Sequence, residues 1–225
     1  MRLMDTEQLE FIARQLLKGI GVTLQITLLA ALLALALAFI VALLRLSPFR
    51  PLSVGARVYI EFFRGTSALV QLFYLFFILP LLGITLSPMT TAVIGLGLNF
   101  SSFGAEIVRS ALVNVGQGQR DALRALDFPA AAGLRRIILP QALPFMLPPL
   151  GSLLVELLKS TSLVSMITLS DLTFSGSTLI TSLGHQTLIW SFVLVCYFFL
   201  SWPLVWLVRR YERRHTRHRG SRGAR

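Results

Sequence analysis

Two opposite charges stand three residues apart at the end of a long uncharged part of the sequence. Glu156 and Lys159 follow the uncharged run 137–155. Residues three apart share one face of a helix, and charges at membrane depth must meet each other, water or a ligand. The spacing therefore leaves two predictions open. One is an ion pair within the helix or between subunits. The other is a zwitterion site, in which Glu156 receives a cationic group and Lys159 an anionic group.

Uncharged polar residues in the neighbouring apolar segments extend this candidate path. They are Gln71, Asn99, Thr161 and Ser162. The three-residue spacing of opposite charges also occurs in two other places, as Glu61 with Arg64 and Glu106 with Arg109. We expect these two pairs to lock helices or subunits together rather than to contact cargo.

The sequence offers no set of residues typical of hydrolysis or of metal binding. Of three histidines, two lie in the basic C-terminal tail. Neither lysine completes a phosphate-binding loop, because Lys18 follows Leu17 and Lys159 follows Leu158, where a glycine is required. We therefore expect no catalytic residue, no metal and no cofactor on this chain, and it is not predicted to be an enzyme.

Long uncharged stretches must position the polar residues. With 55% hydrophobic and 14% charged residues, the chain has too little polar surface for a water-soluble globule of its size. The segment 22–44 is uncharged and long enough to cross a hydrocarbon layer of roughly 30 Å. A signal peptide is the alternative there, but the preceding residues are acidic. We predict one all-α membrane domain over 1–225, with five spans at about 22–44, 62–82, 88–110, 137–160 and 187–208.

Arginine placement predicts the orientation of these spans. Clusters of arginine follow spans one, three and five, and the positive-inside rule assigns those sides to the cytoplasm. The sequence thus favours a bacterial inner-membrane protein with a periplasmic N-terminus and a cytoplasmic C-terminus. We expect the first nineteen residues to form a short amphipathic helix at the outer interface. The basic tail 212–225 is expected to be disordered and to contact anionic lipid rather than nucleic acid.

The cytoplasmic segment 114–136 is longer than a helix hairpin requires, which is typical of a loop with a partner. A helix is predicted over 117–126, ending near Asp127 because Pro129 disfavours helical geometry at Phe128. A second short helix is predicted over 130–139. A helix that merely rests on lipid headgroups is the alternative interpretation of this elbow.

This segment resembles the EAA loop of ABC importer permeases. The family motif reads E-A-A, three residues, G, nine residues, then I-x-L-P, and the chain matches its alanine at Ala122 and its I-x-L-P at 137–140. Asp121 keeps the acid, Leu123 replaces the second alanine, and Asp127 replaces the glycine. Other stretches resemble the branch of the family that serves polar amino acids, and they read GVTLQITLLA, EFFRGTSALVQLFYLFF, GAEIVRSAL, ILPQALPFMLPPLG and LLKSTSLVSMI.

The resemblance implies a type I ABC importer permease with a cytoplasmic coupling helix. The ATPase-coupling residues that it implies are Asp121, Ala122, Leu123, Ala125, Leu126, Asp127 and Gly133. Implied partners are two ABC ATPase subunits, which bind ATP and Mg, an extracytoplasmic solute-binding protein and a second permease subunit, in a heterodimer rather than a homodimer. The implied cargo is a polar amino acid or a similar zwitterion. A compatible solute such as ectoine, an ion-coupled secondary carrier and an exporter remain alternatives.

Overall fold

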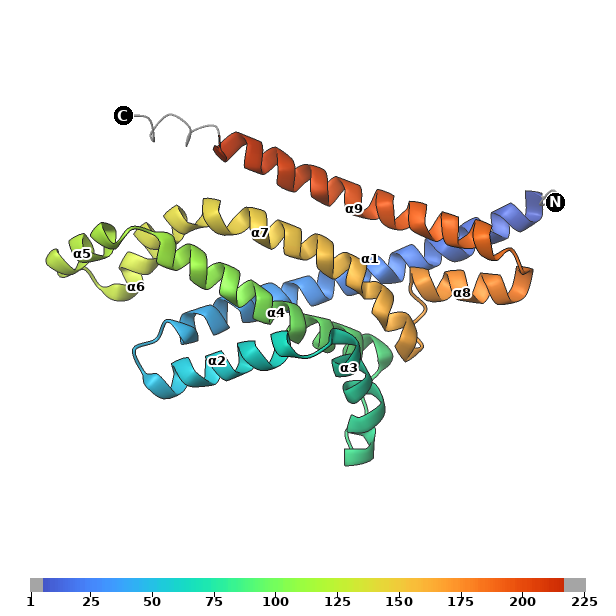
Figure 1. The fold of residues 1–225 in the computed structure, drawn as a ribbon, viewed down its shortest axis with the longest axis horizontal. Helices are drawn as coiled ribbons and strands as arrows, with labels where there is room; N and C mark the ends of the chain where they lie inside the picture. The colour runs from blue at the N-terminus through green and yellow to red at the C-terminus, as the bar shows by residue number, and fades with distance from the viewer. Residues whose placement is uncertain (1–5, 217–225) are drawn as a thin grey trace.

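The computed structural model describes residues 6–216, and every regular element in that range is helical (Figure 1). Within residues 6–216, four helices are long and apolar enough to cross a membrane, or five if one sharply bent helix pair counts as a single span. The predicted fold class, an all-α membrane protein, is therefore confirmed. The described part of the chain reaches only the first five residues of the tail expected over 212–225, and those five are helical.

Helix α1 runs without a break through Thr6–Arg45, a length of 40 residues. The prediction of a separate interfacial helix before the first span was wrong. Ile12 and Leu16 are buried against the later helices α8 and α9 instead of facing lipid. Gly19 allows this contact, because a Cβ at that position would lie only 2.9 Å from the carbonyl oxygen of Asp171.

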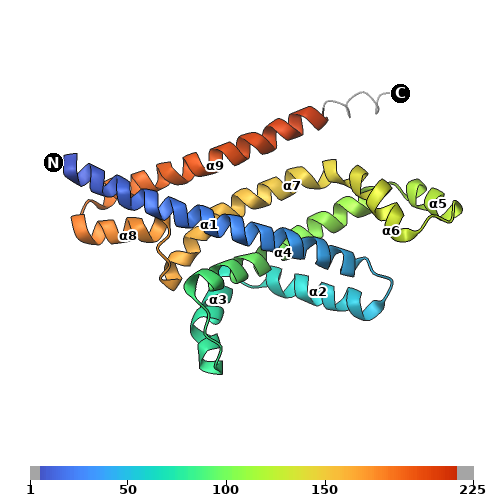
Figure 2. The ribbon, with the colours of Figure 1, turned by 180° about the vertical axis from the view of Figure 1, so that it is seen from behind.

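The second predicted span, 62–82, is not a straight helix. Helix α2 covers Arg50–Gly65, and after a bend of 101° the chain continues as α3 (Ala68–Phe73), a π-helical turn (Tyr74–Ile78) and a 3-10 turn (Leu79–Leu82). We call residues 68–82 the side arm. It projects from the bundle in both ribbon views (Figures 1 and 2).

Helix α4 (Pro88–Asn114) is the central helix of the bundle and covers the predicted span 88–110. It packs along α1, α2 and α7. Glycines permit the close crossing of α4 with α1, because a Cβ at Gly97 would lie 2.6 Å from Leu33 and one at Gly104 would lie 2.9 Å from the Cβ of Ala38. Small residues at such contacts are typical of helix packing in membranes.

The cytoplasmic elbow and the fourth span form one connected segment. Helix α5 covers Gln117–Ala125, and the chain then continues through α6 (Ala130–Gly133), a π-helical turn (Leu134–Ile138) and α7 (Leu139–Ser160). The residues predicted as a second short helix, 130–139, are helical, but the helix does not end there, since the helical path continues from Ala130 into the span. Three prolines lie inside α7 without ending it.

After α7 the chain forms a 3-10 helix (Thr161–Ile167), then α8 (Leu172–Leu183) and α9 (Gln186–Thr216). Sequence reasoning missed α8, which is too short to span a membrane. The carboxylate of Asp171 caps it by accepting hydrogen bonds from the backbone N–H of Thr173 (3.2 Å) and Phe174 (2.9 Å). Burial of Leu172 and Leu179 then fixes α8 against α1 and α9.

Candidate functional site

Helix α5 presents a mixed polar and apolar surface at one end of the molecule (Figure 1). Asp121, Ala122 and Ala125 are exposed on it, and the Leu126 side chain that follows is 76% exposed. Asp121 and Arg124 form an exposed ion pair of 3.8 Å. Small residues flanked by charges let a second protein approach the helix closely while the charges fix its register.

Leu123 occupies a different side of α5 and faces the inside of the elbow. A Cβ placed on the buried Gly133 would lie 3.1 Å from Cδ1 of Leu123 and 3.6 Å from Cδ1 of Phe128. The backbone N–H of Phe128 also donates a 2.9 Å hydrogen bond to the carbonyl of Leu123. Leu123 and Gly133 therefore fit each other, so the larger side chain at this motif position is accommodated within the loop.

Asp127 stands where the EAA motif has glycine, and its backbone explains why glycine suits that position. The φ angle of Asp127 is 51°, in the left-handed region. Non-glycine residues are uncommon there, although aspartate and asparagine tolerate it better than most. The turn after α5 therefore keeps the geometry that a glycine would adopt freely.

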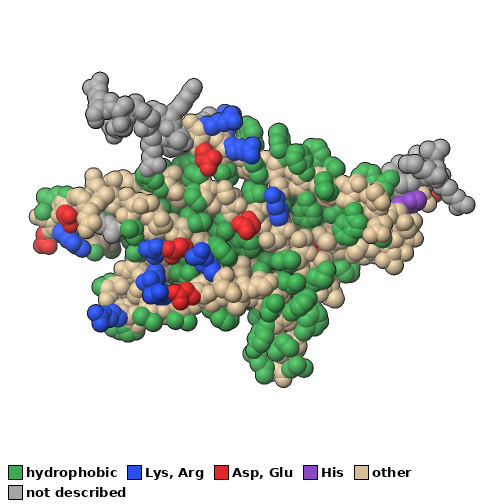
Figure 3. Space-filling model, viewed as in Figure 1, with side chains coloured by type: hydrophobic (Ala, Val, Ile, Leu, Met, Phe, Trp, Pro, Cys, Tyr) green, Lys and Arg blue, Asp and Glu red, His purple; other side chains and the backbone are tan. Residues whose placement is uncertain are grey.

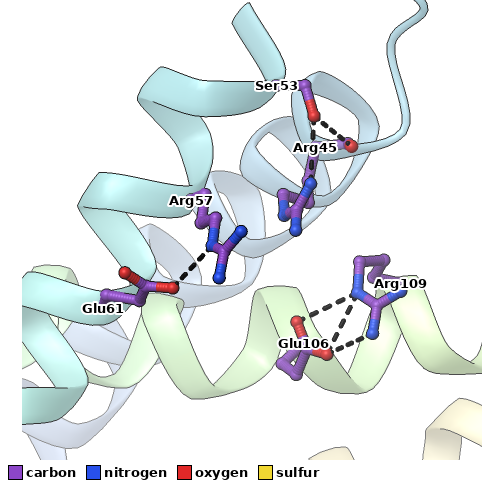
Figure 4. A network of polar contacts seen from close by, with 6 residues as sticks. All are labelled: Arg45, Ser53, Arg57, Glu61, Glu106 and Arg109. Carbon is purple, nitrogen blue, oxygen red and sulfur yellow. Dashed lines mark hydrogen bonds and ion pairs between the residues drawn. The ribbon is translucent and has the colours of Figure 1, made fainter. Parts of the chain in front are cut away.

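Charged side chains gather where the C-terminal end of α1, helix α2 and helix α4 meet (Figure 4). Nε of Arg109 donates hydrogen bonds of 3.0 Å to both carboxylate oxygens of Glu106, so this predicted pair is present. The predicted pair of Glu61 with Arg64 was wrong. Glu61 instead accepts a 2.7 Å hydrogen bond from Arg57, one turn earlier in α2.

Arg64 turns toward α4 and lies over the ring of Phe103, with its guanidinium carbon 5.2 Å from the ring centre. Both residues line an open hollow of about 850 Å³ between α4 and α7. Glu106, Ser152 and Glu156 also line it. Figure 3 shows charged side chains of both signs beside apolar surface on this face of the molecule. Sequence reasoning did not select Arg64 or Phe103 as path residues, because nothing in their local pattern sets them apart from packing residues.

Glu156 and Lys159 are both exposed on α7, and no ion pair joins them or links either one to another described residue. Their depth follows from their neighbours. Leu154 and Leu157 lie beside Ala34 and Ala38 of α1. These two alanines lie about 10–17 Å from Arg45, the last residue of α1, at 1.5 Å per residue along the helix. Both charges are thus held at membrane depth on an open face of the subunit.

The uncharged candidates lie elsewhere and form hydrogen bonds within the chain. Nε2 of Gln71 and Nδ2 of Asn99 both donate to the carbonyl of Phe63, at 3.2 and 3.0 Å. The Thr161 hydroxyl is buried and donates to the carbonyl of Leu158 at 2.7 Å. Ser162 is half-buried, and its carbonyl accepts a 2.7 Å hydrogen bond from Ser165. These four residues do not line the hollow that Glu156 lines.

Comparisons with known proteins fit this geometry. Residues 34–217 match the family model described as "Binding-protein-dependent transport system inner membrane component". The "Probable amino-acid ABC transporter permease protein y4tF" of Sinorhizobium fredii is 42% identical over 91% of this chain and 89% of its own length. From the same organism, y4tG, which bears the same description, is 36% identical over 70% of this chain and 66% of its own length.

A solved structure supports the same assignment. The chain superposes with a TM-score of 0.86 and 30% identity on a chain from the "Crystal structure of an amino acid ABC transporter with histidines", covering 95% of this chain and all of that one. The family match, the relatives and the shared fold agree with one another. The chain belongs to the family of binding-protein-dependent transport system inner membrane components, the permeases of ABC importers.

Proposed function

We propose that this chain is a permease subunit of an ATP-driven importer and forms part of the membrane path for a polar amino acid or a similar zwitterion. The observation that carries the proposal is α5, a short helix with an exposed face at one end of a bundle that has no nucleotide-binding loop of its own. The amino-acid descriptions of its relatives support the cargo class.

Two ATPase subunits would bind ATP and Mg and receive α5 through Asp121, Ala122, Ala125 and Leu126. Leu123, Asp127 and Gly133 would act indirectly, by holding the elbow in shape. An extracytoplasmic binding protein would deliver the cargo. We favour a heterodimer with a second permease, because y4tF and y4tG are two related permeases of one organism.

The proposed orientation places α5 and the C-terminus in the cytoplasm of a bacterium and the N-terminus in the periplasm. Arg45 at the end of α1 and the arginines near the end of α9 lie toward the same side as the elbow, as the positive-inside rule requires (Figure 1). The two chain ends thus lie on opposite sides of the inner membrane in this proposal.

The cargo path would run along the open face of α7. Glu156 lines the hollow, and Lys159 is exposed on the same helix but does not line it. Neither charge forms an ion pair with a described residue, so water, cargo or a second subunit must meet them. A zwitterion carries the complementary charges, with its ammonium group toward Glu156 and its carboxylate toward Lys159. A second permease subunit facing this surface would enclose the path.

Uptake into vesicles tests the proposal. The full assembly, with its ATPase and binding protein, should accumulate a labelled polar amino acid only when ATP is supplied. Collapse of the proton and sodium gradients should leave the rate unchanged. Uptake that needs a gradient and proceeds without ATP would contradict the proposal and favour a secondary carrier.

A further inference from the structure

A cavity of about 500 Å³ lies between the bundle and the elbow, which is formed by α5, α6 and the turn that joins them. We call it the elbow cavity. Its walls are the end of α1, the end of α4 and residues of the segment 123–138. Both ribbon views show the elbow at the end of the bundle where α4 ends and α7 begins (Figures 1 and 2). The volume is in the range typical of sites for small organic ligands.

The elbow wall of this cavity is apolar and incompletely covered. Ala130, Ala131 and Gly133 line it and carry little or no side chain to fill the space. Leu123 and Phe128 belong to the same wall, and both are only half-buried. Among the described side chains, no apolar one between positions 117 and 133 is fully buried. The folded chain therefore leaves apolar surface inside the elbow, and covering that surface with an apolar ligand is favourable.

The elbow cavity lies at the level where hydrocarbon meets lipid headgroups. Leu43 and Leu46 of its wall stand on either side of Arg45, the last residue of α1. Leu112 lies two residues before the end of α4, and Ile138 directly precedes α7. Three helices that cross the membrane thus begin or end at this level. Acyl chains reach the cavity from one side and headgroups from the other.

The surroundings of the elbow cavity are basic. Arg124 is the one charged residue among its described lining residues, and its 3.8 Å ion pair with Asp121 is exposed and weak. Within two positions of a lining residue, the sequence holds more arginines than acids. They are Arg45, Arg50, Arg124, Arg135 and Arg136, against Asp121 and Asp127. Basic pockets between membrane helices on the cytoplasmic side are typical sites for anionic lipid headgroups.

We propose that the elbow cavity binds an anionic phospholipid, with one acyl chain along the apolar wall and the phosphate beside Arg124. Water is a poor occupant, because an ordered water needs about two to four polar partners and Arg124 offers the one charged side chain of the wall. The lipid would support the elbow from the Leu123 side, while the exposed Ala122 side stays free for the ATPase. The inference rests on the proposed function only for the leaflet that supplies the lipid.

Photolabelling with a lipid tests the proposal. The full transporter, with its ATPase, is placed in phosphatidylcholine nanodiscs that contain a small fraction of phosphatidylglycerol with a diazirine on one acyl chain. A matched sample carries the diazirine on phosphatidylcholine instead. After irradiation, mass spectrometry measures the adducts within 112–138 relative to those on α9, where the exposed Phe198 and Phe199 report general lipid contact.

Three variants locate the label. Ala131→Trp fills the elbow cavity from the elbow wall. Val113→Trp is the matched control, because it adds the same side chain at an exposed position beside Leu112 but outside the cavity. Arg124→Gln removes the charge at a position that is 82% exposed. Because such a position tolerates substitution, Arg124→Gln keeps the test decisive even if the tryptophan variant does not assemble.

We expect phosphatidylglycerol to label 112–138 severalfold more than phosphatidylcholine does. Ala131→Trp should remove most of this label, Val113→Trp should keep it, and Arg124→Gln should abolish the preference for phosphatidylglycerol. Equal labelling by the two lipids, or equal labelling of the two tryptophan variants, would overturn the proposal. Label that appears only after the ATPase is removed would also overturn it, because the ATPase would then be the occupant. Labelling needs no ATP or cargo, so uptake tests the proposed function separately.

Discussion

The side-chain amide of Asn99 donates a 3.2 Å hydrogen bond to Oε1 of Gln71, and both side chains also donate to the carbonyl of Phe63. Two residues that the sequence selects as path candidates thus meet at the bend between α2 and α3. They supply hydrogen-bond donors to a carbonyl that the bend leaves without a helical partner. In this structure their contacts serve the shape of the bundle.

Replacing Asn99 with leucine should destabilise the chain by about 1–3 kcal/mol, the typical cost of leaving buried polar groups unpaired. The substitution keeps the side-chain size but removes the donor to Phe63 and to Gln71. Thermal unfolding in detergent measures the change. The control is Ser177→Ala on the exposed face of α8, which should have little effect because Ser177 bonds only within its own helix. An unchanged midpoint for Asn99→Leu would contradict this role.

Asp127→Gly should stabilise the elbow by roughly 1 kcal/mol, because glycine adopts the left-handed region freely. The φ angle of 51° at Asp127 is the reason. Asp127→Val should have the opposite and larger effect, since β-branched residues are strained there. Protease cleavage rates within 117–133 report the local stability of the loop. Faster cleavage of the glycine variant than of the parent would refute the argument.

Burial of Asp171 raises the pKa of its carboxyl above the ordinary 3.8, and hydrogen bonds from Phe174 and Thr173 oppose the shift in part. The folded chain therefore holds this proton to a higher pH than the unfolded chain does. As pH rises from the ordinary pKa to the raised one, Asp171 should lower the free energy of unfolding.

Asp171→Asn keeps a side-chain cap for α8 but carries no charge. The melting temperature of Asp171→Asn minus that of the parent should therefore increase as pH rises from the ordinary pKa of Asp171 to the raised one. Above the raised pKa, this difference should become constant. A gap that widens in favour of aspartate with rising pH would show that the pKa is lowered, not raised.

Glu156→Gln should lower ATP-driven uptake by about tenfold or more, the effect of losing one hydrogen bond to a charged group. Stability in detergent should hardly change, because no described residue forms an ion pair with Glu156. Glu10→Gln is the control, since its ion pair with Arg14 is exposed and far along α1. Normal uptake by Glu156→Gln would remove Glu156 from the proposed path.

The features of the fold that depend on a single segment of the chain were predictable from the sequence. Uncharged length located the segments that became α1, α4, α7 and α9, and Pro129 correctly placed the end of α5 near Asp127. Each of these features depends on a periodicity, a helix breaker or a length that a single segment carries by itself.

Features that depend on tertiary contacts were not predictable in the same way. The bend at Thr66 is fixed by Asn99, which lies more than thirty positions later in the chain. The continuity of α1 depends on burial of Ile12 and Leu16 against α8 and α9. Arg57 and Arg64 both lie within one helical turn of Glu61, so spacing alone could not choose between them.

Co-purification of the ATPase with elbow variants tests the central claim most directly. Ala122→Arg adds a charge to the exposed face of α5, whereas Gln117→Arg adds the same charge to an exposed position about 140° away around that helix. We predict that Ala122→Arg inserts normally into the membrane but loses its ATPase, while Gln117→Arg keeps it. Full retention of the ATPase by Ala122→Arg would contradict the claim that this face of α5 receives the force of ATP hydrolysis.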